Sequence, residues 1–132
     1  MIVADTSAVL AVLCADPPEA RLRQRLAEDA DLHAPHLIDV EIIHALRRLV
    51  ASGNVTEQRA MSVRADYSQL TMTRYPHHPL ADRMWELRHN LTAYDAAFVA
   101  LSEALGVPFV TCDARLAGAS GHSACIEVFP VR

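Results

Sequence analysis

Short apolar segments typical of strands alternate with longer helical segments along this chain. The strand-like segments cover residues 2–4, 32–34, 70–74, 109–111 and 126–129. Antiparallel strands can be joined by a two-residue turn, whereas parallel strands need a longer crossover, usually a helix. Helices between successive strands therefore indicate parallel pairing. The sequence predicts an α/β fold, a parallel β-sheet flanked by helices on both faces, in a single domain over residues 1–132.

Helix signals fill the intervals between these strands. Helices are expected over residues 6–14, 16–28, 37–51, 56–67, 79–89 and 93–105, with a helical turn over 114–117. The helix over 37–51 has the clearest end, because Gly53 follows it closely. Thr56 is a good N-cap for the next helix. Gly106 and Pro108 end the helix over 93–105.

The absence of lysine excludes several classes of enzyme. All 12 basic side chains are arginines. P-loop NTPases, Schiff-base enzymes and protein kinases each depend on a particular lysine, so none of them fits. The net charge is −4, which provides no general attraction for nucleic acid. A bound polyanion would therefore need a local arginine patch or metal ions.

Cysteine, histidine and hydropathy patterns exclude further classes. The three cysteines lack CxxC spacing and are expected to be reduced, mostly buried thiols. No histidine pair has a second pair at zinc-finger spacing. The longest apolar run, residues 8–15, is too short to cross a bilayer. The N-terminus has no basic start, and Asp5 interrupts its apolar stretch, so we expect a cytoplasmic protein without a signal peptide and no membrane association.

Four carboxylates occupy informative positions. Asp5 ends the first strand, Asp113 follows the fourth strand, and Asp95 lies in the first turn of a helix. Ligands of open parallel sheets bind at the carboxyl ends of the strands. Each of these three residues can also be explained by helix capping, Asp95 within a capping box that starts at Thr92. For these three residues alone, both interpretations stay open.

Helix capping does not explain the position of Glu41. Its neighbours one helical turn away include Leu37, Ile38 and Ala45, so the carboxylate shares an apolar face. A carboxylate in such a place is costly unless a hydrogen-bond partner or a cation compensates it. Asp95 repeats the pattern beside Phe98. The sequence therefore predicts one acidic pocket formed by Asp5, Glu41, Asp95 and Asp113.

Four carboxylates without cysteine or histidine form a set of hard oxygen ligands. Such ligands suit Mg²⁺, with Mn²⁺ as a substitute. Magnesium held by carboxylates and waters typically polarises a phosphoryl group and orients an attacking water. The residues by themselves therefore favour metal-dependent hydrolysis of a phosphodiester.

Four segments in order resemble the acidic motifs of PIN-domain ribonucleases. They are IVADTSA at 2–8, LIDVE at 37–41, LTAYDAAF at 91–98 and VTCD at 110–113. Their order, separations and the chain length resemble the VapC toxins of bacterial type II toxin–antitoxin modules. This resemblance implies a PIN-like nuclease domain with Mg²⁺-dependent endoribonuclease activity. It also implies a homodimer, an RNA substrate, and a cognate VapB-type antitoxin that blocks the acidic site.

The resemblance also assigns roles by position. Asp5, Glu41, Asp95 and Asp113 match the catalytic and metal-binding quartet, with Asp5 and Asp95 the clearest metal ligands. Thr6 and Thr111 match hydroxyl positions that orient the carboxylates. Asp39 precedes Glu41 by two residues, so it points elsewhere on the helix. Cys112 is interpreted as a packing residue.

Arginines near the quartet are candidates for RNA binding. Arg47, Arg48 and Arg115 follow the acidic residues closely, and a guanidinium can take a phosphate with two hydrogen bonds. They can equally be surface charges that keep the protein soluble. Tyr94 and Trp85 can stack on bases, although packing in the core or an interface is favoured for Trp85.

Two other functions stay open at the level of sequence. A PIN-type nuclease can act in RNA maturation or DNA processing without an antitoxin. Alternatively, the chain can be a non-enzymatic α/β binding module whose acidic residues are only helix caps.

Overall fold

The protein forms one parallel β-sheet, as the alternation of strands and helices predicts. The computed structural model describes residues 1–131. Each neighbouring pair of strands in the order β3-β2-β1-β4-β5 is parallel. The strands are β1 (Ile2–Ala4), β2 (Leu32–Pro35), β3 (Met72–Tyr75), β4 (Phe109–Thr111) and β5 (Ile126–Val128). β1 is therefore central, and its three residues are fully buried.

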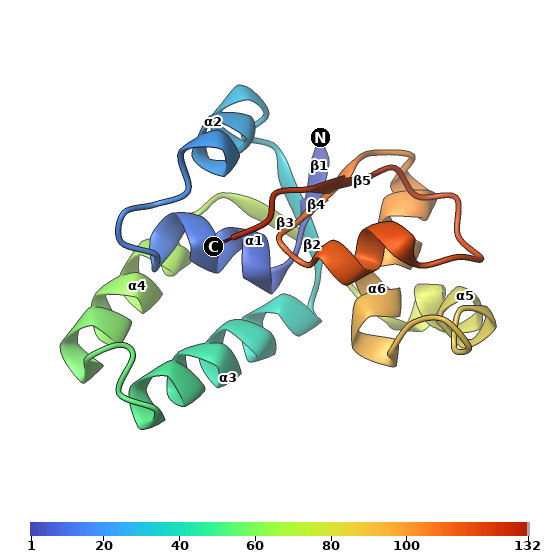
Figure 1. Ribbon diagram of the computed structural model, residues 1–132. Helices are drawn as coiled ribbons and strands as arrows, with labels where there is room; N and C mark the ends of the chain where they lie inside the picture. The colour runs from blue at the N-terminus through green and yellow to red at the C-terminus, as the bar shows by residue number, and fades with distance from the viewer. Residues whose placement is uncertain (132) are drawn as a thin grey trace.

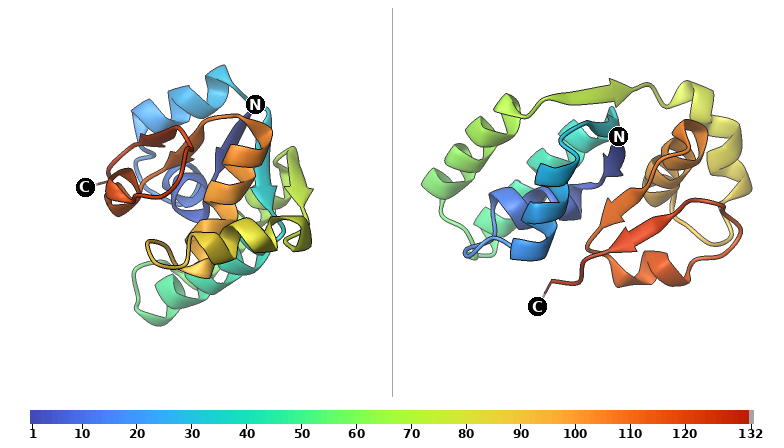
Figure 2. Two further views of the ribbon diagram at one scale, coloured as in Figure 1. Left: turned by 90° about the vertical axis from the view of Figure 1, so that its right-hand side faces the viewer. Right: turned by 90° about the horizontal axis from the view of Figure 1, so that it is seen from above.

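Helices cover both faces of the sheet (Figure 1). One side carries α1 (Thr6–Leu13), α2 (Ala20–Glu28), α3 (Leu37–Ala51) and α4 (Glu57–Gln69), and the other carries α5 (Ala81–Glu86) and α6 (Ala93–Leu105). The view from above in Figure 2 separates the two groups, with the strands between them. Two 3-10 turns, η1 (His78–Leu80) and η2 (Ala114–Gly118), complete the elements. The expected α/β fold is confirmed.

Two helices differ from the sequence-based expectation. α2 begins at Ala20 rather than at residue 16, because each proline of the pair Pro17 and Pro18 disfavours the helical conformation of the residue before it. The helix expected over 79–89 is divided into η1 and α5, and α5 ends at Glu86. Beyond it the chain turns, with the amide of Asn90 donating to the carbonyl of Leu87 at 3.1 Å.

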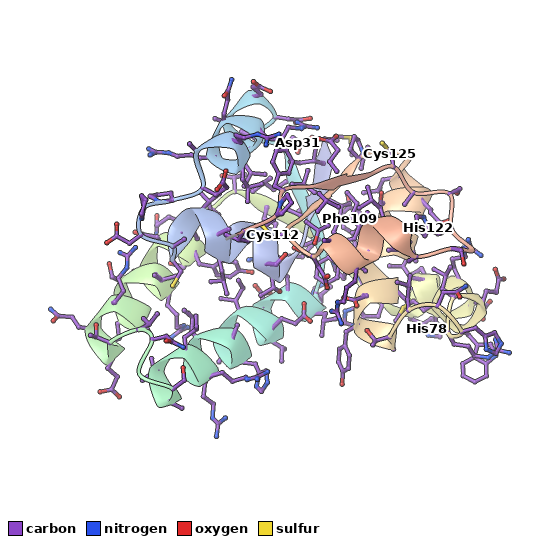
Figure 3. The ribbon with its side chains drawn as sticks, in the orientation of Figure 1. Asp31, His78, Phe109, Cys112, His122 and Cys125 are labelled. Carbon is purple, nitrogen blue, oxygen red and sulfur yellow. The ribbon has the colours of Figure 1, made fainter. Side chains whose placement is uncertain are left out.

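All five strands run in the same direction, so the two ends of the sheet differ. Figure 3 labels Asp31 and Cys125, which precede β2 and β5, at one end of the sheet, and Cys112, which follows β4, toward the other. α1, α3 and η2 begin directly after the carboxyl ends of β1, β2 and β4. Because parallel strands bring these ends to one edge, residues distant in sequence meet there.

Three arginine–carboxylate pairs join elements of the fold. Arg74 of β3 contacts Asp39 of α3 at 2.8 Å, and Tyr67 of α4 also donates to Asp39, at 2.7 Å. Arg83 of α5 binds Glu103 of α6 with two hydrogen bonds of 2.9 Å each. Arg25 of α2 likewise pairs with Glu127 of β5 at 2.8 Å. Asp39 thus points away from Glu41, as its offset predicts, and pairs with Arg74.

The three cysteines are less buried than the sequence predicts. All three thiols are free, but Cys125 is exposed and Cys14 and Cys112 are only half-buried, so the expectation of mostly buried thiols is wrong. The reason is that each lies at or beyond the end of an element, where covering side chains are fewer. No helix in this part of the chain is both long and apolar enough to cross a membrane.

Candidate active site

Asp5 lies at the carboxyl end of the central strand and is only 7% exposed. Its Oδ2 accepts a hydrogen bond from the Thr111 hydroxyl at 2.5 Å. Its Oδ1 accepts from the Ser7 hydroxyl at 2.6 Å and from the Ala8 amide at 3.0 Å. Burial nevertheless raises the pKa of Asp5 above its ordinary value, and repulsion from Asp95 adds to the rise.

Ser7 is a site residue that sequence reasoning missed. Its hydroxyl donates to Asp5 and accepts a hydrogen bond from the Cys112 amide at 3.0 Å. The same oxygen lies 3.3 Å from Oγ1 of Thr111. Ser7 thereby joins the end of β1 to the end of β4. Its position two residues after Asp5, in the first turn of a helix, was the available signal.

Glu41 comes to the site from α3. Thr6 donates to Oε1 of Glu41 at 2.9 Å, across 35 positions of sequence. Burial raises the pKa of Glu41, and repulsion from Asp5 and Asp95 acts in the same direction. The hydroxyl of Thr6 thus orients a carboxylate, which is the geometry expected for it.

Asp95 lies in the first turn of α6, where Thr92 is the N-cap. The Asp95 amide donates to the Thr92 hydroxyl at 3.2 Å. Burial raises the pKa of Asp95, and repulsion from Asp113 adds to this, while Arg115 opposes it. Thr92 therefore caps the helix as the capping box that starts there predicts, and the Asp95 carboxylate lies near the positive end of the helix dipole.

Asp113 differs from the other three carboxylates because it has a guanidinium partner. Arg115 contacts its Oδ2 at 2.6 Å and its Oδ1 at 3.0 Å. Hydrogen bonding from Arg115 lowers the pKa of Asp113. Asp113 also caps η2 by accepting from the Arg115 amide at 3.0 Å.

Capping and a shared site turn out to be compatible. Asp5 caps α1 and Asp113 caps η2, as the simpler interpretation predicts. The same two carboxylates lie in the electrostatic field of Asp95, and Glu41 interacts with both Asp5 and Asp95. The fold therefore brings the four predicted acids to one edge of the sheet.

The four acids do not form a closed metal cage. Within residues 1–131 no group of three or more carboxylate, histidine or cysteine side chains is arranged to enclose a metal ion. Magnesium usually keeps several waters and needs only one or two carboxylates of the protein. Burial and mutual repulsion raise the pKa values of three of these oxygen donors, Asp5, Glu41 and Asp95, and the charge of such a cation would compensate both effects.

Two hollows flank the N-terminus of α6. The first, which we term the α3 groove, has a volume of about 550 Å³ and is lined by α3 together with Thr6 and Tyr94. Glu41 is part of its wall. The second hollow, of about 520 Å³, is lined by Thr92, Asp95 and Arg115, among others. Each hollow thus contains one of the predicted acids.

The candidate RNA-binding residues lie in different surroundings in the structure. Arg48 lines the α3 groove, whereas Arg47 does not, and Arg115 is paired with Asp113. Trp85 is 68% exposed on α5, so it does not pack in the core, and its packing at an interface stays a prediction. Its ring lies under the guanidinium of Arg88, with 4.3 Å between Cζ of Arg88 and the ring centroid.

Comparisons with known proteins agree with this geometry. The model of the PIN domain family matches residues 2–121. Ribonuclease VapC9 of Mycobacterium tuberculosis is 44% identical over 131 residues, covering 98% of this chain and 99% of its own. Ribonuclease VapC12 of the same species is 39% identical, covering 97% and 98%. VapBC2 from Rickettsia felis, solved bound to a promoter DNA fragment, superposes with a TM-score of 0.69 at 12% identity, covering 98% and 99%.

Proposed function

Since this chain belongs to the PIN-domain family and to the VapC ribonucleases within it, we propose that Asp5, Glu41, Asp95 and Asp113 are its catalytic acids. The protein is an endoribonuclease of the VapC toxin type. One observation carries the assignment of the site. Three carboxylates at the carboxyl edge of the sheet are buried or half-buried, repel one another, and have no arginine partner in the part of the chain described.

We propose Mg²⁺ as the cofactor, with Mn²⁺ as a substitute. Asp5 and Asp95 are the ligands of choice, and Glu41 and Asp113 complete the acidic environment. When bound, the ion polarises the scissile phosphate and activates water. Without a bound cation, the four acids would repel the phosphates of the RNA backbone.

The neighbouring side chains prepare these acids for their role. Ser7 and Thr111 hold both oxygens of Asp5, which fixes the direction of its lone pairs. Thr6 holds Oε1 of Glu41 by a hydrogen bond. The raised pKa of that carboxyl suits it to take a proton at Oε2 from an attacking water. Such supporting hydrogen bonds typically change activity by about 10–100-fold when lost.

We propose that a VapB-type antitoxin controls the enzyme. VapBC2 from Rickettsia felis and VapBC from Salmonella typhimurium are solved structures of the same fold bound to DNA. A pocket of carboxylates attracts a cation, so the antitoxin would insert an arginine or lysine near Asp5 and Asp95. The complex should then weaken with added salt.

We propose a homodimer in the cytoplasm, with residues 1–132 forming one PIN-like nuclease domain. Sedimentation of the purified protein tests the dimer directly, and a monomeric mass at micromolar concentration would contradict it.

RNA cleavage by the purified protein tests the central proposal. Wild type should cut labelled single-stranded RNA in Mg²⁺ or Mn²⁺ and lose this activity in chelator. The Asp5→Asn variant should be inactive in all three conditions. Cleavage that persists in chelator, or in purified Asp5→Asn, would refute the metal site.

A further inference from the structure

The α3 groove contains features that the catalytic acids do not explain. Tyr94, one residue before Asp95, lines it and is 62% exposed. Val40 of α3 lines the same groove and is 66% exposed. Tyr94 lies in the first turn of α6, before the buried run of that helix begins at Ala96. The groove therefore offers an aromatic ring and an aliphatic surface that contribute nothing to the core.

The groove is also continuous with the acidic site. Thr6 and Glu41, which hydrogen-bond each other, form part of its wall. A strand cleaved at the acids would therefore have a neighbouring part within reach of the groove. This continuity favours a piece of the substrate as occupant over an unrelated ligand.

The charges of the groove suit a strand of nucleic acid. His44 and Arg48 line it one helical turn apart on the same face of α3. Arg48 lies seven residues beyond Glu41, about 10 Å along the helix axis. In residues 1–131 Arg48 makes no ion pair, unlike Arg25, Arg74, Arg83 and Arg115. Its guanidinium can therefore take a phosphate.

We propose that the α3 groove holds one unpaired nucleotide beside the scissile phosphate. Its base stacks on Tyr94 and its backbone phosphate contacts Arg48. A base inside a duplex is already stacked and paired, so the groove selects single strands or loops. The inference rests on the proposed ribonuclease function and adds a determinant of substrate choice to it.

Binding to an inactive variant tests the groove without cleavage. In an Asp95→Asn background, a fluorescent single-stranded RNA oligonucleotide of mixed sequence should bind about tenfold more weakly after Tyr94→Ala, as for other loss of base stacking. Tyr94→Phe should restore binding because it keeps the ring. Arg48→Ala should weaken binding and lower the slope of log affinity against log salt by about one.

Two matched controls lie outside the groove. Trp85→Ala removes an aromatic ring of similar exposure from α5, and Arg64→Ala removes an exposed arginine from α4. Both should bind the oligonucleotide as the parent does. A duplex of the same sequence should bind the parent and Tyr94→Ala equally, because its bases cannot reach the ring.

Cleavage mapping adds the readout of specificity. In a library of randomised RNA oligonucleotides, active wild type should show a base preference next to the cut that Tyr94→Ala loses and Tyr94→Phe keeps. Unchanged binding and preference in Tyr94→Ala would overturn the inference. So would a loss of the dimer in Tyr94→Ala, since the groove would then be a protein interface. Wild type that cleaves no RNA contradicts the proposed function instead, and the binding experiment still decides the groove.

Discussion

Carboxylates occupy two contrasting environments in this molecule. Asp39 and Glu103 each meet an arginine, and their pKa values are lowered, that of Glu103 to about 2. Glu41 and Asp95 are half-buried as well, but burial and the repulsion of other carboxylates raise their pKa values. Both groups consist of acids on helices, so residue type and secondary structure do not separate them.

The difference identifies which acids hold the fold together and which are available for chemistry. A paired carboxylate stabilises the native state at neutral pH, because its charge is compensated there. An unpaired, half-buried one destabilises it, because desolvation and repulsion oppose its charge. Natural sequences retain such a cost mainly at functional sites. Asp113 is intermediate, since it lies beside Asp95 but pairs with Arg115.

The largest contrast is expected in activity. Asp95→Asn should lower the rate of RNA cleavage by at least about 100-fold, more than typical losses of supporting hydrogen bonds. Glu103→Gln, on the same helix, should stay within about twofold of wild type when both are folded. Initial rates on a labelled RNA measure both. Equal losses in the two variants would erase the distinction between the groups.

The reverse contrast is expected in stability. Glu103→Gln should lower the free energy of unfolding by about 1–3 kcal/mol, because it weakens charge-assisted bonds from Arg83 and two bonds from Ser123. Urea denaturation measures the loss. The folded pKa of about 2 lies below the ordinary 4.5, so the advantage of wild type is complete above about pH 4.5 and shrinks as pH falls toward 2. A difference that persists at pH 2 would contradict the ion pair as its source.

Divalent cations should stabilise the native protein through the acids without an arginine partner, Glu41 and Asp95, and not through Asp39 or Glu103. At ten times its dissociation constant, Mg²⁺ or Mn²⁺ adds about 1.4 kcal/mol, which raises the melting temperature by about 5 °C. Asp95→Asn should show a much smaller rise, whereas Glu103→Gln should respond as wild type does. Thermal melts in chelator and in metal provide the comparison. A metal-indifferent wild type would remove the argument for an acidic metal site.

The smallest effect concerns the metal-free protein. Asp95→Asn should be more stable than wild type by about 0.5–1 kcal/mol at neutral pH, since it removes repulsion. Because the folded pKa of Asp95 is raised, this advantage is complete only above that pKa and fades as pH falls to the unfolded value of 3.8. Helix capping alone predicts the opposite sign, a loss of a few tenths of a kcal/mol. Urea denaturation in chelator at two pH values decides between them.

Much of the fold could be predicted because local patterns determined it. The bounds of α3 and α6 match the expected ranges, since Gly106 ends one and Gly53 follows the other closely. The parallel sheet followed from helices between strands. The single helix expected over 79–89 failed, because the chain turns after α5 where local propensity would have continued it.

The sequence by itself therefore determined most of the elements, their parallel pairing and the identity of the acids. Only the tertiary structure decided which acid meets an arginine. Glu103 pairs with Arg83, 20 positions away in sequence, and Asp39 pairs with Arg74, 35 positions away. Glu41 instead lies beside Thr6 and the other acids. The tertiary structure alone likewise decided the contacts of Ser7 and the exposure of Trp85. The physical reason is that burial and charge pairing depend on neighbours brought together by packing, which a helical or strand periodicity does not encode.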